Sequence, residues 1–195
     1  MVTHHYTEAR LGAQAIAYWQ RAGERAVQHS ANAEAITHLT KGLELLAALP
    51  DTPERSRQEL TLRTALGPAL VATKGNAAPE VELTYARAVE LCRQVGETSQ
   101  LFPVLFGLRS VYLVRGEIQT AHEFGEQLLG LAENAQDSSF LLEARIALGN
   151  TAYIRGDFAL AHTQFEHALG LYDPQQHRSH AFVYGLDPGC LAFAG

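Results

Sequence analysis

Histidine and cysteine are the residue types of this chain that could bind a metal ion or supply a nucleophile. The chain has nine histidines, and the nearest to clusters are His4 with His5, His162 with His167, and His177 with His180. Two histidines on one helical face would stand four positions apart, whereas His162 and His167 stand five apart. No cysteine or paired carboxylate joins these groups in a recognisable pattern. We therefore expect no metal site and no cofactor.

The two cysteines, Cys92 and Cys190, are too few and too far apart for a disulfide framework or a zinc site. Neither has a histidine near it in sequence, and no Gly-x-Ser-x-Gly string is present. No Gly-x-x-x-x-Gly-Lys-Ser/Thr phosphate loop occurs, and in residues 72–75 the lysine precedes the glycine. The sequence therefore predicts no catalytic residue and no enzymatic activity for this chain.

The tripeptide Arg155-Gly156-Asp157 spells a cell-adhesion motif, but Arg115-Gly116-Glu117 stands forty positions earlier. The similarity continues beyond the tripeptide, since eight of the seventeen positions from 115 to 131 are identical to those from 155 to 171. A fixed period of about 20 to 50 residues is typical of stacked supersecondary units. Both tripeptides are therefore predicted to be turns of a repeat. The histidines and Cys92 then lie on or beside the helices between such turns.

The composition and the apolar spacing predict an all-α chain. It is 47% hydrophobic and 18% charged, and Gly, Pro and polar clusters separate segments with apolar residues at i, i+3, i+4 and i+7. We expect a single array over 1–195 made of antiparallel helix pairs and the start of a fifth pair, within residues 7–49, 54–95, 98–134, 138–172 and 178–195. Thr52 and Pro53 are expected to start one helix, and Asp137 with Ser138 to cap another.

Within each pair the details resemble the tetratricopeptide repeat, which implies a right-handed superhelix, or α-solenoid. The last pair carries the residues that match the repeat pattern: Leu148-Gly149, Gly156, Phe158, Ala161, Phe165 and Ala168. Gly149 and Ala161 would allow close approach of helices, while Phe158 and Phe165 would fill the space between units. The preceding pair departs from the pattern, with Arg109 in place of Gly and Gly125 in place of an aromatic residue.

Longer strings resemble the tetratricopeptide-like helical region of large bacterial signal-transduction (STAND-type) P-loop ATPases. The strings are residues 18–23, 38–44, 72–75, 100–105 and 172–179. Many members of that family carry a class III adenylate or guanylate cyclase domain, which is absent here, as is the ATPase domain. The resemblance implies a non-catalytic region that receives a signal and controls the ATPase. The chain departs from the family where Asn76 and Arg109 replace aromatic residues and where His180 replaces an apolar residue.

The inner surface of such a superhelix is lined by the first helix of each pair. Projecting the repeat onto this chain gives the following groove residues: Phe106, Ser110, Leu113, Val114, Glu143, Ile146, Asn150, Tyr153 and Ile154. The groove is mostly apolar, so it fits an amphipathic helix or another domain of the parent chain better than a terminal carboxylate. Two alternatives remain open: these side chains simply pack on neighbouring helices, or the concave face binds a metabolite as a small-ligand sensor.

The partner is expected to be a protein. The formal net charge is −6 and the basic residues are scattered, so no basic stripe could neutralise phosphates, and nucleic acid is excluded as a partner. No apolar run reaches the roughly 18 residues that span a bilayer, and no secretory signal opens the chain, so a cytoplasmic location is expected. The apolar segment 190–195 resembles the start of an uncapped helix, which predicts a fragment of a longer protein that self-associates through this edge.

Overall fold

The computed structural model describes the backbone of residues 2–177 and the side chains of residues 12–177. Over these residues the secondary structure is helical, with no strand, which confirms the all-α prediction. The helices are α1 Val2–Gln28, α2 Asn32–Ala47, α3 Pro53–Lys74, α4 Pro79–Val95, α5 Leu101–Val114, α6 Ile118–Ala135, α7 Ser138–Ile154, α8 Phe158–Leu171 and α9 Pro174–His177. The predicted segment 178–195, with its self-associating edge, lies outside the described residues.

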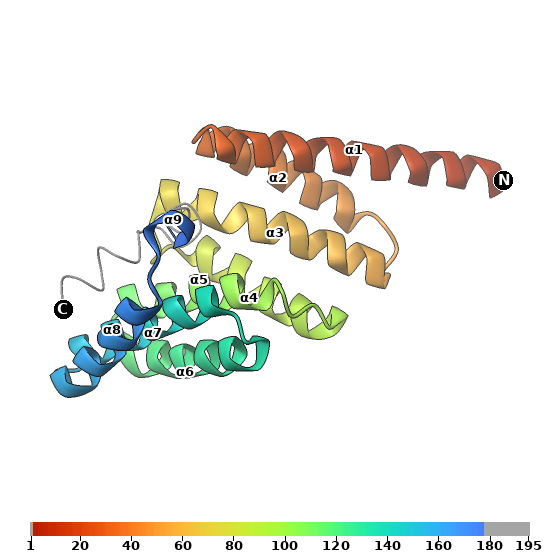
Figure 1. Ribbon diagram of the computed structural model, residues 1–195. Coiled ribbons are helices and arrows are strands. Elements are labelled where there is room, and N and C mark those ends of the chain that lie inside the picture. Colours follow the sequence, from red (N-terminus) through yellow and green to blue (C-terminus); the bar gives the residue numbers. More distant parts are fainter. Residues whose placement is uncertain (1, 178–195) are drawn as a thin grey trace. The chain divides into compact units, whose positions relative to one another are not determined.

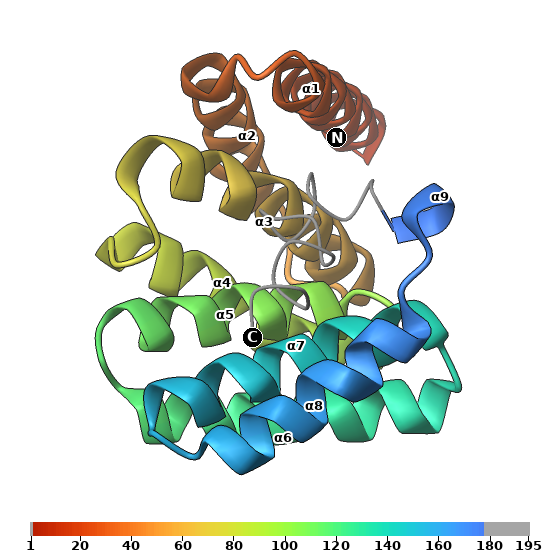
Figure 2. The same ribbon diagram turned by 60° about the vertical axis from the view of Figure 1, so that its left-hand side comes forward.

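The chain divides into two compact units, residues 1–101 and residues 102–195. In the first unit α1 packs on α2, α2 on α3 and α3 on α4, so the four helices lie side by side in chain order (Figure 1). In the second unit α6 packs on α7 and α7 on α8 (Figure 2). In each of these pairs, helices that follow one another in the sequence are therefore also packed together in space.

Local sequence signals set the helix starts that the spacing predicted. The Thr52 side chain accepts a hydrogen bond from the Arg55 amide at 3.2 Å, and Pro53 occupies the first helical position of α3, where its missing N–H costs nothing. The Asp137 carboxylate accepts hydrogen bonds from the Ser139 and Phe140 amides at 2.8 and 3.1 Å and so caps α7. A cap of this kind stabilises a helix by about 1 kcal/mol.

The two turns with the repeated tripeptides have the same backbone geometry. Gly116 and Gly156 both have φ of +80°, a left-handed conformation that glycine adopts without steric cost. In each turn the amide of the next residue donates to a carbonyl near the end of the preceding helix, Glu117 to Tyr112 and Asp157 to Ala152, each at 2.9 Å. The prediction that Arg155-Gly156-Asp157 forms a structural turn is therefore confirmed.

Small residues inside the helices bring consecutive helices close together. At each of five glycines an added Cβ atom would lie within 3.2 Å of a bulky side chain on the next helix. The pairs are Gly23 with Leu39, Gly42 with Leu62, Gly67 with Tyr85, Gly125 with Leu148, and Gly149 with Phe165. These contacts join α1 to α2, α2 to α3, α3 to α4, α6 to α7 and α7 to α8, so the same packing device recurs along both units.

One aromatic residue departs from its predicted role. Phe165 is 6% exposed and packs in a cluster with Ala152 and Ala161, as expected for a residue that fills a helix interface. Phe158, which was expected to do the same, is 63% exposed and meets Tyr153 edge to face with ring centroids 5.6 Å apart. The prediction for Phe158 is wrong because no described helix covers the start of α8 on that side.

Candidate functional site

The predicted groove residues lie on α5 and α7, which contact each other within the second unit. Phe102 of α5 stacks on Phe140 of α7 with ring centroids 4.2 Å apart and planes at 4°. Further along, Arg109 donates from Nη2 to the Ala147 carbonyl of α7 at 2.7 Å. The structure therefore brings the two predicted groove helices side by side.

The groove residues differ in exposure along the two helices. Glu143 and Ile146, in the first half of α7, are buried, and Ile146 packs with Leu142 and Ala168 of α8. Three others near the ends of α5 and α7 are large, apolar and more than half exposed, at 58%, 58% and 53%: Val114, Tyr153 and Ile154. The remaining four are partly buried: Phe106, Ser110, Leu113 and Asn150. The accessible apolar surface is therefore at the C-terminal ends of these two helices.

Ser110 and Arg109 use their polar atoms within the fold. The Ser110 hydroxyl donates to the Phe106 carbonyl one turn earlier at 2.9 Å, an ordinary bond within a helix. Arg109 is 2% exposed, and burial lowers the pKa of its guanidinium to about 10. Its Nε has no hydrogen-bond partner among the described residues, and its charge lies 5.8 Å from the centre of the Phe106 ring. A buried cation with one hydrogen bond is a costly group.

A buried carboxylate in the first unit has a fuller set of partners. Glu59 of α3 accepts hydrogen bonds from Arg63 at 2.8 Å and from Arg87 of α4 at 3.2 and 3.3 Å. Burial would raise the pKa of Glu59, but the hydrogen bonds from the two arginines outweigh it and hold that pKa below its usual range. This cluster joins α3 to α4 and serves packing.

The histidines separate into structural and exposed groups. His122 of α6 lies with Nδ1 at 3.3 Å from the Thr151 hydroxyl of α7, so its side chain serves the contact between these two helices. His162, at the equivalent position of α8, has a side chain that is 65% exposed, with Nδ1 lying 3.6 Å from a carboxylate oxygen of Glu166. His177 is buried, accepts from the Asp173 amide at 2.9 Å and lies 3.3 Å from the Ser139 hydroxyl. His4, His5 and His180 lie outside the residues whose side chains are described.

No metal-binding or nucleophilic site emerges from these groups within the part of the chain that the structure describes. No three His, Cys, Asp or Glu side chains gather there closely enough to hold a metal ion. Cys92 is buried, and burial together with the nearby Glu97 raises its pKa to about 11, so its thiol stays protonated. Cys190 lies outside the described residues.

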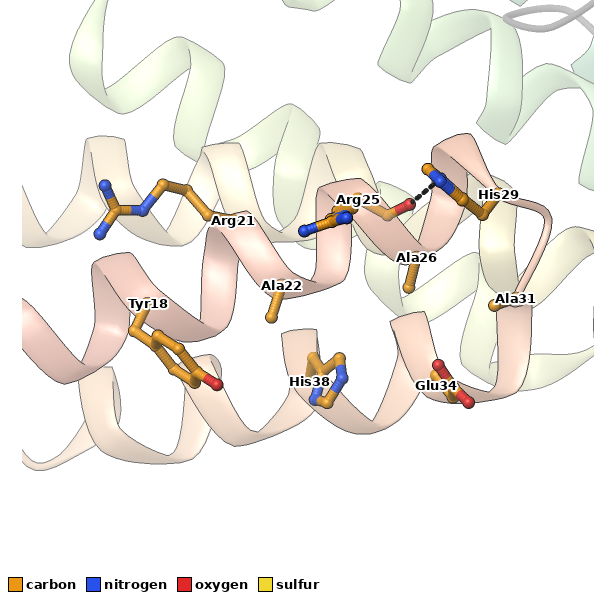
Figure 3. Close-up of a pocket in the computed structure, with 9 residues that line it drawn as sticks. All are labelled: Tyr18, Arg21, Ala22, Arg25, Ala26, His29, Ala31, Glu34 and His38. Atoms are coloured by element: carbon orange, nitrogen blue, oxygen red, sulfur yellow. Dashed lines mark hydrogen bonds between the residues drawn. The ribbon is translucent and has the colours of Figure 1, made fainter.

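A cleft of about 550 Å³ lies between α1 and α2 in the first unit, and sequence reasoning did not find it. Figure 3 shows that its lining combines side chains of α1, the following turn and α2. The lining residues are Tyr18, Arg21, Ala22, Arg25, Ala26, His29, Ala31, Glu34 and His38. The signal that could have revealed it is the four-residue spacing of Arg21, Arg25 and His29, which places them along one side of α1 and of the turn that follows it.

A second, smaller cleft of about 380 Å³ lies in the second unit on α6, α7 and α8. It carries the structural His122 together with Glu126, Glu133 and Gln164. Arg145 of α7 lies beside it, 3.0 Å from the Gln164 amide oxygen and 3.7 Å from Glu133. Its polar groups are thus partly paired across the three helices, unlike the cations of the first cleft.

Comparison with known proteins gives little functional information. No family model matches the chain. It is 26% identical over 144 residues to the uncharacterized protein R02095 of Rhizobium meliloti (strain 1021). The match covers 73% of this chain and 14% of that protein, so the chain spans about one seventh of its relative's length.

Among the described residues, none of the helices is long and apolar enough to cross a bilayer.

Proposed function

We propose that this chain is a non-catalytic, protein-binding and regulatory region built as a tetratricopeptide-like right-handed superhelix of antiparallel helix pairs. The packing of helices in chain order and the recurring glycine contacts support this architecture. The equal turn geometry at Gly116 and Gly156 supports a true structural repeat over the second unit. The repeat gives each first helix an equivalent surface, and that surface is where a partner would bind.

The observation that carries the proposal is the recurrence of exposed apolar residues at one repeat position. Val114 and Ile154 stand forty positions apart at the ends of α5 and α7, and they are 58% and 53% exposed. Tyr153, beside Ile154, is 58% exposed and offers both an apolar ring and a hydroxyl. Large apolar side chains left open at equivalent positions of successive units favour an amphipathic helix as the partner.

We propose further that the parent is a bacterial signalling ATPase or nucleotidyl cyclase, acting in the cytoplasm. Two observations support it: the family resemblance of the strings described above, and a relative of which this chain covers only 14%. In such a parent the helical region binds a protein partner or another domain of its own chain, and that binding controls the catalytic domains. The chain itself supplies no catalytic group and no cofactor site in this proposal.

The test is selection of binders from a displayed library of amphipathic helical peptides, with the whole chain as bait. Selected peptides are then measured against the double variant Tyr153→Ser with Ile154→Ser. We expect binding to weaken at least tenfold, because exposed aromatic and aliphatic anchors carry most of the energy of such interfaces. The matched control is Leu83→Ser, a residue of α4 that is 68% exposed and lies in the other unit.

Unchanged affinity in the double variant would contradict the protein-binding proposal, as would equal loss in Leu83→Ser. Thermal melting of each variant checks that the fold is kept. We expect no change in melting, because surface substitutions away from special features shift stability by less than about 0.5 kcal/mol.

A further inference from the structure

The cleft between α1 and α2 is an open groove that is lined by two exposed arginines and by small apolar residues, and none of these residues belongs to the apolar surface of the second unit. We infer that it binds a small organic anion, with a phosphate or carboxylate group at the arginines and an apolar or aromatic body over the alanines. Its volume of about 550 Å³ exceeds what a bare inorganic anion would fill. Pockets of roughly 300 to 1,000 Å³ are typical of metabolite-sized ligands.

The positive edge of the cleft comes from two arginines of α1. Arg21 and Arg25 of α1 and His29 of the following turn recur every fourth residue, so they lie along one side, as Figure 3 shows. Within the described part of the chain, neither Arg21 nor Arg25 forms an ion pair with a carboxylate, although the chain as a whole carries a net charge of −6. Glu34 is the one carboxylate among the residues lining the cleft. The arginines are thus free to bind an anion in a protein whose other charges are mainly negative.

The hydrogen bonds along this edge leave suitable donors available. Arg21 uses Nε to donate to the Ala17 carbonyl at 3.2 Å, which leaves its terminal nitrogens for a ligand. His29 lies with Nδ1 at 3.0 Å from the Arg25 carbonyl; because a carbonyl can only accept, Nδ1 carries a hydrogen there. Arginine terminal nitrogens are strong donors to phosphate and carboxylate oxygens.

The floor and the opposite wall of the cleft supply apolar surface. Ala22 and Ala26 leave space above α1, and Ala26 is held in place by packing with Ala35 and Ala69. Figure 3 shows the His38 ring rising from α2 toward these alanines. Its position is set by the Trp19 ring, with centroids 5.3 Å apart, and its Nδ1 is buried without a hydrogen-bond partner among the described residues.

The experiment is a titration of the isotope-labelled chain followed by amide NMR shifts. The probes are phenyl phosphate, benzoate, inorganic phosphate and the neutral benzyl alcohol. We expect phenyl phosphate or benzoate to shift amides confined to residues 18–38 and to bind more tightly than inorganic phosphate and benzyl alcohol. Tighter binding by phenyl phosphate would indicate a phosphate ester as the ligand class, and tighter binding by benzoate a carboxylate.

Two arginine variants make the result specific. Arg25→Gln removes a cation from the cleft, whereas Arg93→Gln removes an exposed cation from the last turn of α4, so the helix position and the change in charge are matched. We expect Arg25→Gln to weaken binding about tenfold, the effect of losing one charge-assisted hydrogen bond, and Arg93→Gln to leave it unchanged.

A second variant, Ala22→Leu, fills the cleft without changing its charge and is expected to abolish the confined shifts. Equal weakening in both arginine variants would overturn the inference, because it would reflect general charge attraction. Equal binding of benzyl alcohol and phenyl phosphate would also overturn it, as would shifts spread outside residues 18–38. Because the peptide-binding test depends on Tyr153 and Ile154, either proposal can fail while the other stands.

Discussion

The hairpins α5/α6 and α7/α8 have turns of the same geometry, but they carry bulky and small residues at opposite positions of the repeat. In α7/α8 the first helix carries Gly149 and the second carries Phe165, whose ring lies over that glycine. At the equivalent positions, forty residues earlier, α5 carries Arg109 and α6 carries Gly125. The repeat therefore tolerates an exchange of volume between the two helices as long as one side remains small.

The exchange also changes which helices are joined. Gly125 of α6 makes its close contact with Leu148 of α7. Arg109 of α5 donates a hydrogen bond to the Ala147 carbonyl, which also belongs to α7. The first of the two hairpins thus packs through these positions onto α7, whereas the second packs within itself through Phe165. The difference teaches that a departure from a repeat pattern can serve the contact between units, so it is not simply degeneracy.

The largest effect on the free energy of unfolding is expected from removing the Phe165 ring, since the equivalent position of the α5/α6 hairpin is Gly125. Phe165→Ala should lower the free energy of unfolding by about 3 kcal/mol, because it leaves a cavity beside Gly149. Phe158→Ala, which removes a ring that is 63% exposed, should change it by less than about 0.5 kcal/mol. Urea denaturation followed by circular dichroism measures both. Equal losses would show that Phe165 does not hold α8 to α7.

The next effect tests the small partner of that ring. A Cβ at position 149 would lie 2.6 Å from Phe165 Cε1, so Gly149→Ala should cost about 2 kcal/mol of overpacking, against a helix-propensity gain of about 1 kcal/mol. The matched control is Gly130→Ala in α6, where nothing lies within 4 Å and only the gain of about 1 kcal/mol is expected.

Combining Gly149→Ala with Phe165→Leu should recover part of the loss, because the smaller side chain makes room for the new methyl group. A double-mutant cycle of denaturation midpoints measures this coupling. Strict additivity of the two changes would contradict the proposed contact.

In the α5/α6 hairpin, replacing the bulky residue Arg109 should stabilise the fold, whereas replacing Phe165 should destabilise it. Arg109→Met replaces a buried cation by an apolar side chain of similar length, so it should raise the free energy of unfolding at pH 7 by about 1 kcal/mol. Folding lowers the pKa of Arg109 to about 10, so between that pH and the higher pKa of the unfolded chain the unfolded state binds more protons, and the wild-type chain gains stability as the pH rises.

The advantage of the methionine variant should therefore be complete below about pH 10 and shrink above it. Parallel denaturation at pH 7 and above pH 10 measures the change. A loss of stability at pH 7 would show that the bond to the Ala147 carbonyl outweighs the cost of burying the charge.

The smallest effect concerns the feature that the two hairpins share. Gly116→Ala and Gly156→Ala should each cost about 1 kcal/mol, because alanine is strained at positive φ and no neighbour crowds either site. The two losses should agree within about 0.5 kcal/mol, and asparagine at either position should cost less than alanine. Melting temperatures of the variants would reveal a difference, which would mean that the two turns are not equivalent.

Features that depend on a few neighbouring residues could be predicted from the sequence. The helix starts at Thr52 and Asp137 and the turns at Gly116 and Gly156 follow from capping hydrogen bonds and backbone conformation, which short stretches of chain determine. The helix α9, Pro174–His177, was not predicted, since four residues carry no periodic signal. The functional prediction was likewise limited to a surface, because no string of residues specified a reaction.

Packing decided what the sequence left open. The projection of the repeat could place Ile146 and Ile154 on the same helix, but only the tertiary structure buries the first against Ala168 and leaves the second exposed. It also buries Arg109, exposes Phe158 and opens the cleft between α1 and α2. The sequence by itself determined the helices α1 to α8, their turns and their order, because hydrogen bonds between near neighbours act locally. Only the tertiary structure decided which faces are covered, because burial depends on helices that are distant along the chain.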